Sequence, residues 1–156
     1  MTARNSEHGF TLLELLVVIT LIILIAGIAI PRFAGVTDEG RKAKARGELK
    51  TLQTAIESYL LNTSPTLPAA AGGNLTDIQT ALEGATPRLV GEVTDFVDPF
   101  TASSTYLYKI DTNSRYYVIH SVGPDRTADI SSMSTSGDVT GGPDDDIFAT
   151  NGQLPS

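Results

Sequence analysis

The order of hydrophobic and polar residues divides the chain into an apolar N-terminal segment and a mixed C-terminal part. Residues 10–30 form an almost unbroken apolar run in which Glu14 is the only charged side chain. A helix over this run is about 30 Å long, which is enough to cross the hydrocarbon core of a bilayer. The pattern therefore predicts a membrane-spanning helix.

From Pro31 onward the hydrophobic spacing becomes that of an amphipathic helix. Apolar residues recur at steps of three and four, which places them on one helix face. These residues are Ala45, Leu49, Leu52, Ile56 and Tyr59. A kink or local loosening is expected at Pro31, and the helix is expected to end near Leu61, before the stop signal of residues 62–65. We expect the apolar face to pack on the protein's own C-terminal domain, with a partner surface as the alternative.

The remaining residues predict a small domain that contains both helix and strand. A linker rich in Pro, Ala and Gly, residues 65–74, precedes a short helix from Leu75 to Glu83. Residues 93–100 are expected to be extended and closed by a proline turn. The segments 105–110 and 115–122 are rich in Tyr, Val and Ile, so they predict an antiparallel hairpin.

Alternation along the hairpin leaves one question open. Tyr106, Tyr108 and Ile110 share one face of the first strand, but the pattern does not show which face is buried. His120, in the second strand, is interpreted as a strand residue and not as a metal ligand or base.

Charge is distributed unevenly along the chain. The net charge is −7 at pH 7, which argues against nucleic acid as a partner. Residues 32–50 contain six Lys or Arg and three acids, whereas the chain from Thr51 onward contains four basic and thirteen acidic residues. An acidic C-terminal part beside a basic neck could support contacts between subunits or the capture of a cation.

The absence of cysteine excludes disulfides as a means of stabilising a small extracytoplasmic domain. A metal ion is the usual substitute in domains with small cores. The chain has only two histidines, His8 and His120, but many carboxylates. This composition argues against zinc and favours calcium, which takes roughly six to eight oxygen ligands.

A distinctive motif lies where the apolar run begins. A short hydrophilic leader is followed by Gly9-Phe10-Thr11-Leu12-Leu13-Glu14. A cleavable secretory signal has a shorter apolar core followed by small residues at the cut, and this sequence has neither. A plain membrane anchor is the alternative, but it gives no reason for Glu14, because an acid near mid-membrane costs roughly 2.5–3.5 kcal/mol.

This motif closely resembles the N-terminus of the type IV prepilin family, which includes type IV pilins and the pseudopilins of type II secretion. The resemblance implies that a membrane aspartyl peptidase cuts after Gly9 and that the new N-terminal residue, Phe10, is methylated. Glu14 would neutralise the Phe10 ammonium of a neighbouring subunit and so set the register of the packed helices. Pro31 would mark the place where the helix melts during assembly. The leader departs from the family in carrying an acid and a histidine beside a single arginine.

The C-terminal half resembles the major pseudopilins of type II secretion through the segments DPF, YLYKI, YYVIHSVGPD and DDDI. In those proteins calcium ties the final loop in place of a disulfide. The resemblance therefore implies a calcium site, with Asp125 and Asp146 as the best ligand candidates. The further candidates are Asp145, Asp129 and the Ser121 oxygen. Arg126 stands where the family has glycine, and the loop of residues 130–143 is longer than in the family.

The expected fold is α+β and pilin-like. A long N-terminal helical spine, half membrane segment and half amphipathic, packs on a small antiparallel β-sheet head. The expected divisions are a leader over residues 1–9, a transmembrane and fibre-core helix over residues 10–31, an amphipathic continuation over residues 32–62 and a globular head over residues 63–156.

The expected function is structural, as a homopolymer that forms a pseudopilus of a type II protein secretion system after cleavage and methylation. The expected partners are prepilin peptidase, the inner-membrane assembly platform and minor pseudopilins. The precursor would cross the inner membrane once with its head outside the cytoplasm, and the product would be a periplasmic or extracellular fibre. A type IV pilus subunit for adhesion, motility or DNA uptake is the close alternative. A membrane-anchored binding module or enzyme is disfavoured, because the mature part has one histidine, no cysteine and no phosphate-binding glycine motif.

Overall fold

A single long helix enters a small mixed domain. The computed structural model describes residues 10–101 and 103–153, and of residues 29–35 it describes the backbone alone. The chain divides into two compact units between Asp38 and Glu39. Helix α1 (Leu12–Asn62) belongs to both units and ends one residue beyond the expected position. Its backbone stays helical through Pro31, where the sequence predicts a kink or local loosening.

The first half of α1 presents apolar side chains to its surroundings. The large apolar residues between Phe10 and Ile28 are exposed, and they cover the whole circumference of the helix. No helix in the described part of the chain is long and apolar enough to cross a membrane. The membrane helix expected over residues 10–31 includes residues 29–31, whose side chains lie outside the description.

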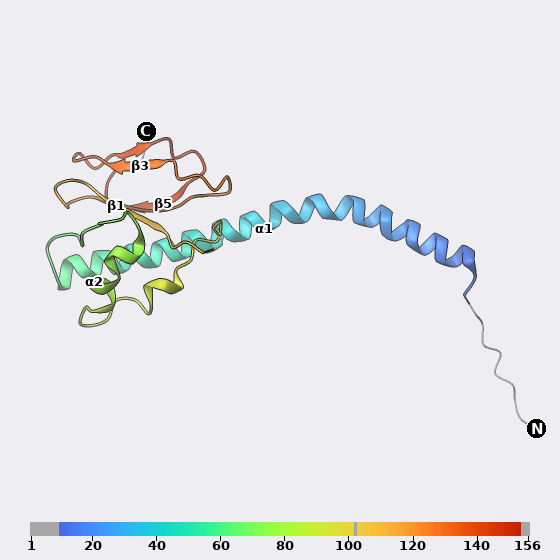
Figure 1. Cartoon of the computed structure of the whole chain (residues 1–156), viewed down its shortest axis with the longest axis horizontal. Helices are drawn as coiled ribbons and strands as arrows, with labels where there is room; N and C mark the ends of the chain where they lie inside the picture. Colours follow the sequence, from blue (N-terminus) through green and yellow to red (C-terminus); the bar gives the residue numbers. More distant parts are fainter. Residues whose placement is uncertain (1–9, 102, 154–156) are drawn as a thin grey trace, which may run out of the picture. The chain divides into compact units, whose positions relative to one another are not determined.

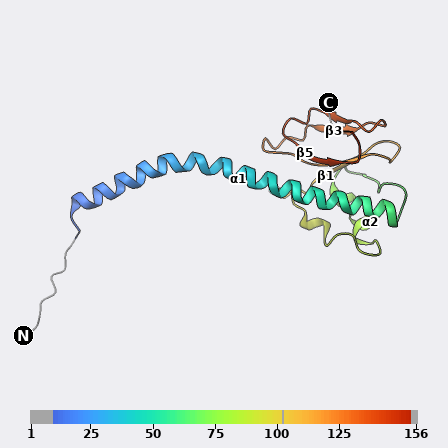
Figure 2. The same ribbon diagram turned by 180° about the vertical axis from the view of Figure 1, so that it is seen from behind.

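In the second unit, a β-sheet and a short helical segment lie on opposite sides of α1 (Figure 1), and the view from behind shows the same arrangement (Figure 2). The helical segment consists of η1 (Leu75–Ile78), α2 (Gln79–Glu83) and η2 (Val93–Asp95). The short helix expected from Leu75 to Glu83 is therefore confirmed, with a 3-10 turn as its first part. Asn74 and Asp77 form a capping box at its start, which satisfies the free N–H groups there.

The main sheet has three antiparallel strands in the order β1 (Leu107–Ile110), β2 (Tyr117–Ser121), β5 (Ile147–Thr150). The predicted hairpin is confirmed as β1 and β2, in which Ile110 lies opposite Tyr117. On the other side of β2, His120 lies opposite Phe148. Every residue of β2 is buried, as expected for the central strand.

Two segments differ from the sequence prediction. Residues 93–100 begin with η2 and not with an extended strand, because Val93 is buried and its N–H donates to Glu83 Oε1 at 2.7 Å. The segment of residues 130–143 is a hairpin of β3 (Ile130–Met133) and β4 (Val139–Gly141), and not a plain loop. In β3 two exposed serines separate two buried ends, so the strand does not follow the alternation that identifies strands in a sequence.

The predicted apolar face of α1 forms the centre of the core. Ala45, Leu49, Leu52 and Ile56 are fully buried, and Tyr59 packs against the same cluster. This confirms that the face packs on the protein's own domain. Tyr108 of β1 and Tyr106, just before β1, enter this core, so the tyrosine face of the first hairpin segment is the buried one. The Tyr106 hydroxyl donates to Glu48 Oε2 at 2.6 Å and thereby ties the sheet to α1. Burial and this contact raise the pKa of Tyr106 far above its ordinary value.

Asp111 closes the turn between β1 and β2. Its buried carboxylate accepts hydrogen bonds from the N–H groups of Asn113, Arg115 and Tyr116, at 3.0, 2.7 and 2.8 Å. Burial alone would raise the pKa of Asp111, but the three backbone hydrogen bonds outweigh burial and hold it below its ordinary value.

Asp111→Asn is therefore expected to destabilise a soluble fragment of residues 39–156 by about 1 kcal/mol or more at pH 7, because an amide oxygen accepts these bonds less strongly. The folded carboxyl has the lower pKa, so its contribution is fully present above the unfolded pKa, about 3.9, and disappears as the pH falls through the folded pKa. Urea unfolding of both proteins between pH 7 and pH 3 checks this. A difference in the free energy of unfolding that stays constant down to pH 3 would contradict it.

Candidate functional site

The N-terminal motif lies at the start of α1. Gly9 falls outside the described residues, while Phe10 is 79% exposed. The hydroxyl of Thr11 accepts the N–H of Glu14 at 3.2 Å, which caps the helix. Glu14 lies in the first turn, where a carboxylate interacts favourably with the helix dipole. The Glu14 side chain is exposed at the start of the helix, where a partner outside this chain can reach its carboxylate.

The second group of predicted residues lies in two loops that meet beside the end of β2. The loop that follows β2 carries Asp125 and Asp129, and the loop that precedes β5 carries residues 144–146. Gly123 brings the two loops together. It adopts φ +68°, and a Cβ at this position would lie 2.5 Å from the Asp145 carbonyl oxygen. Only glycine permits both this backbone conformation and this approach.

Three carboxylates converge where the loops meet. Asp125, Asp129 and Asp145 each offer an oxygen, and these oxygens all lie within 4.8 Å of one another. Asp145 Oδ2 accepts the N–H of Asp125 at 2.9 Å, whereas Asp145 Oδ1 is buried without a hydrogen-bond partner. A buried oxygen without a donor is costly unless a cation or another donor binds it.

The electrostatics of this cluster favour a bound cation. The pKa of Asp129 is raised by burial first and then by the negative charges of its carboxylate neighbours, Asp125, Asp145 and Asp144. A divalent ion would relieve that repulsion. Carboxylates and exposed loop carbonyls are the ligands that calcium prefers, so the residues fit such an ion. They do not fit zinc, because neither cysteine nor histidine belongs to the cluster.

The structure places the other two predicted ligands elsewhere. Asp146 is buried, and its Oδ2 accepts the N–H groups of Asp129 and Ile130, each at 3.0 Å. It therefore holds the backbone that carries Asp129. The Ser121 hydroxyl donates to Asp98 Oδ1 at 2.8 Å. Of the five residues predicted as ligands, the structure thus brings together Asp125, Asp129 and Asp145.

The buried side chain of His120 contacts Asp146, with Nδ1 3.4 Å from Asp146 Oδ2. Burial, together with the charge of Lys109, lowers the pKa of His120 to about 4. The ring is therefore neutral at pH 7, and the contact with Asp146 is not an ion pair. Burial also raises the pKa of Asp146, against the two backbone hydrogen bonds that lower it.

Asp98 is a structural residue of the site that was not singled out from the sequence. Its buried carboxylate accepts hydrogen bonds from the N–H groups of Phe100 and Val122, at 3.0 and 2.9 Å, in addition to the Ser121 hydroxyl. It thereby fastens the Asp-Pro-Phe turn to the end of β2. The signal was present in the sequence, because Asp98 is the first residue of the DPF segment.

Comparison with known proteins identifies the family of the N-terminal motif and several relatives of the chain. Residues 4–30 match the family described as prokaryotic N-terminal methylation motif. Fimbrial protein Q of Moraxella bovis is 34% identical over 85 residues, which are 54% of this chain and 54% of that protein. The type II secretion system core protein G of Escherichia coli K12 is 36% identical over 62 residues, 40% of this chain and 43% of that protein.

A third relative, type IV major fimbrial protein FimA of Dichelobacter nodosus, is 33% identical over 91 residues, 51% of this chain and 58% of that protein. The chain thus spans about half the length of the curated relatives it matches. No solved structure matches the chain. The motif and these relatives confirm the resemblance to the type IV prepilin family, with relatives among both secretion core proteins and fimbrial proteins. The α+β, pilin-like fold class is confirmed as well.

Gly123→Ala is expected to destabilise the fragment of residues 39–156 by about 2 kcal/mol or more, since it combines a positive φ with a contact that a methyl group cannot make. Gly47→Ala is the matched control. Gly47 lies within α1 with no atom near its missing Cβ, so alanine there should stabilise the fragment by about 0.5–1 kcal/mol. Thermal unfolding measures both, and a Gly123→Ala fragment as stable as the parent would contradict the placement of the two loops.

Proposed function

We propose that the chain is the structural subunit of a fibre, cut after Gly9 and held together by the first half of α1. The observation that carries this proposal is the apolar surface of α1, which is exposed around the whole helix between Phe10 and Ile28. Such a surface is stable only in lipid or against other helices. The precursor would occupy the inner membrane, and the mature chains would bury the same surface against one another.

Glu14 gives this packing its register. Cleavage after Gly9 creates an ammonium group on Phe10, next to the apolar surface. An ammonium and a carboxylate are each costly in apolar surroundings but far less so as a pair. The Glu14 carboxylate of one copy would pair with the Phe10 ammonium of another. Both charges are paired at only one shift of the two helices along the fibre axis, so the pair sets their register. Pro31 would let the helix loosen locally as the copies pack.

A pseudopilus of a type II secretion system is the favoured fibre. The C-terminal loops converge on an acidic cluster in a chain without cysteine, and the secretion core proteins are among the relatives. A type IV pilus is the second candidate, because fimbrial proteins are also among them. The partners would be prepilin peptidase for the cut and the methylation, an inner-membrane assembly platform, and minor pseudopilins.

Calcium is the proposed ion for the acidic cluster. Asp125, Asp129 and Asp145 would hold it, and the unpartnered Oδ1 of Asp145 supports this assignment. Asp146 would not bind the ion itself but would position the backbone of Asp129, whose N–H it accepts. Bound there, the ion would join the loop after β2 to the loop before β5.

Glu14→Gln is expected to leave cleavage after Gly9 intact and to reduce the yield of fibres at least roughly tenfold, because the Phe10 ammonium loses its partner. Fibres sheared from cells and processing on gels measure the two effects. Thr20→Val is the control, since among the described residues the Thr20 hydroxyl bonds only to Leu16 O of its own helix. For a pseudopilus, export of secreted proteins falls together with fibre yield. Unchanged export with lost surface fibres would assign the chain to a pilus, and normal fibres from Glu14→Gln would contradict the proposed packing.

Calcium is expected to raise the melting temperature of the fragment of residues 39–156 relative to the fragment in excess EGTA. An ion at about 100 times its Kd stabilises the folded state by about 2.7 kcal/mol. The rise should disappear in Asp125→Asn combined with Asp145→Asn. It should persist in Asp138→Asn, whose carboxylate binds Ser134 and Ser136 in another turn. Identical melting curves with calcium and with EGTA would exclude this site.

A further inference from the structure

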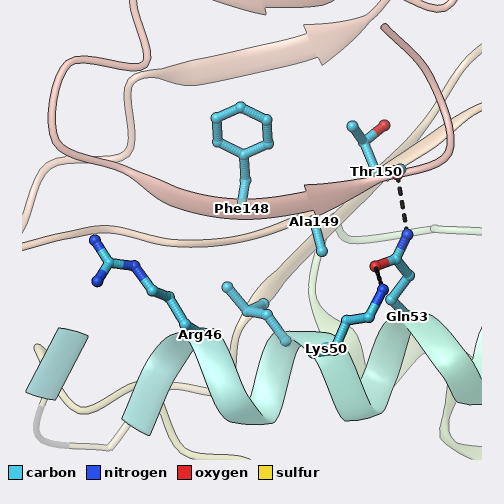
Figure 3. Close-up of a pocket in the computed structure, with 7 residues that line it drawn as sticks. Arg46, Lys50, Gln53, Phe148, Ala149 and Thr150 are labelled. Atoms are coloured by element: carbon cyan, nitrogen blue, oxygen red, sulfur yellow. Dashed lines mark hydrogen bonds between the residues drawn. The ribbon is translucent and has the colours of Figure 1, made fainter. Parts of the chain in front are cut away.

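A groove runs between α1 and the edge strand β5. It encloses about 320 Å³, and its walls are formed by two short runs of residues from these elements (Figure 3). From α1 come Arg46, Leu49, Lys50 and Gln53, and from β5 come Phe148, Ala149 and Thr150. The long side chains of Arg46, Lys50 and Gln53 project from α1 toward β5 in Figure 3, which makes the helix side of the groove polar.

The groove lies at the open edge of the sheet. At the opposite edge, the segment that leads into η1 lies along β1. Tyr108 N–H of β1 donates to Gly73 O, and Leu75 N–H donates to the oxygen of Tyr106, the residue before β1. At β5, the only hydrogen bond from outside the sheet to the strand's backbone, among the described residues, is the one from Gln53 Nε2 to Thr150 O, at 3.2 Å. The groove is therefore accessible to another molecule.

Two positive charges in this groove have no acidic partner. Elsewhere on the same stretch of α1, Lys42 pairs with Glu39 and Lys44 pairs with Glu48. Within the described part of the chain, Arg46 contacts no acid, and the Lys50 ammonium donates to the neutral Gln53 Oε1 at 3.0 Å. No carboxylate lines the groove. Arg46 and Lys50 stand one helical turn apart. In Figure 3 the Arg46 guanidinium points toward one end of the groove and the Lys50 ammonium toward the other, so each end of the groove carries one cation.

A matching acidic surface lies on the other side of α1. Glu92 and Asp95 flank the turn of η2, and both are exposed. In the described part of the chain neither carboxylate contacts a donor. Val93, between them, is fully buried and fixes the turn to the core. Figures 1 and 2 both place the segment of η2 and the main sheet on opposite sides of α1.

We propose that, in the fibre, the groove of one copy receives the Glu92–Asp95 turn of the next copy, with Arg46 and Lys50 facing the two carboxylates. This inference rests on the proposed function. An open helical fibre requires a contact between two different faces of the subunit, and the groove and the turn are such a pair. Copies with a net charge of −7 repel one another, so a contact between them requires local charge complementarity.

The acidic loop near Asp144 is the less suitable partner. Asp125 and Asp145 are engaged in hydrogen bonds within the two loops, and the proposed ion would neutralise them further. The carboxylates of Glu92 and Asp95 accept no hydrogen bond in the described part of the chain, and they lie outside the proposed ion site. Their turn is also held rigidly by Val93 and by the bond from its N–H to Glu83, so little order would be lost on docking.

The absence of cysteine permits a direct test in cells that assemble the full chain. Lys50→Cys combined with Asp95→Cys, oxidised with copper phenanthroline, is expected to give a ladder of cross-linked species larger than dimers. Each copy then has one thiol on each face, and only a repeating contact between different faces links more than two copies. Each single variant alone stops at a dimer. Lys50→Cys with Asp138→Cys is the control for random collision, and Lys50→Cys with Asp144→Cys tests the acidic loop.

Charge exchange supplies a second measurement on the same cells. Arg46→Glu with Lys50→Glu should reduce fibre yield at least tenfold, and adding Glu92→Lys with Asp95→Lys should restore it. Two results would overturn this contact but not the proposed fibre. In the first, the wild-type chain forms fibres but Lys50→Cys with Asp95→Cys gives no ladder. In the second, only Lys50→Cys with Asp144→Cys gives a ladder. A wild-type chain that forms no fibre would overturn both.

Discussion

Carboxylates that accept hydrogen bonds from backbone N–H groups hold the loops of the C-terminal domain. Asp98 fastens a turn to the end of β2, Asp111 closes the β1–β2 turn, and Asp146 fixes the start of β3. Asp77 and Glu83 do the same around η1 and η2. In a chain without cysteine, these bonds provide much of the fixation that disulfides provide elsewhere.

Because of this arrangement, the number of acidic residues does not equal the number of carboxylates available to external partners. Several of the thirteen acids after Thr51 belong to loops and caps, and their charges are satisfied by the backbone. The acids that remain for external partners are few and localised. Among the described residues they are the cluster of Asp125, Asp129 and Asp145, the exposed pair Glu92 and Asp95, and the exposed Glu57 and Asp144. Net charge alone therefore overestimates how much of the surface can attract cations.

Periodicity predicted the parts of the fold in which one face is buried along many residues. The stripe from Ala45 to Ile56 and the β1–β2 hairpin follow from spacing, because each repeats the same environment several times. The β3–β4 hairpin has no such repeat, and the turn at Val93 depends on a contact with Glu83 that local sequence does not show. The N-terminal motif was recognisable because its residues are contiguous.

The candidate ion site shows a finer limit of sequence reasoning. The resemblance to pseudopilins located both loops but ranked Asp146 above Asp145. In the structure an oxygen of Asp145 belongs to the cluster, whereas Asp146 Oδ2 accepts the N–H of Asp129. Asp144 and Asp145 lie in a bend before β5, so a shift of one position changes which carboxylate faces the cluster. Spacing within a run of three aspartates cannot fix that position, since each offers the same chemistry. Gly123 decides it in the fold, because its missing Cβ lets the Asp145 carbonyl approach and so sets how the second loop is turned.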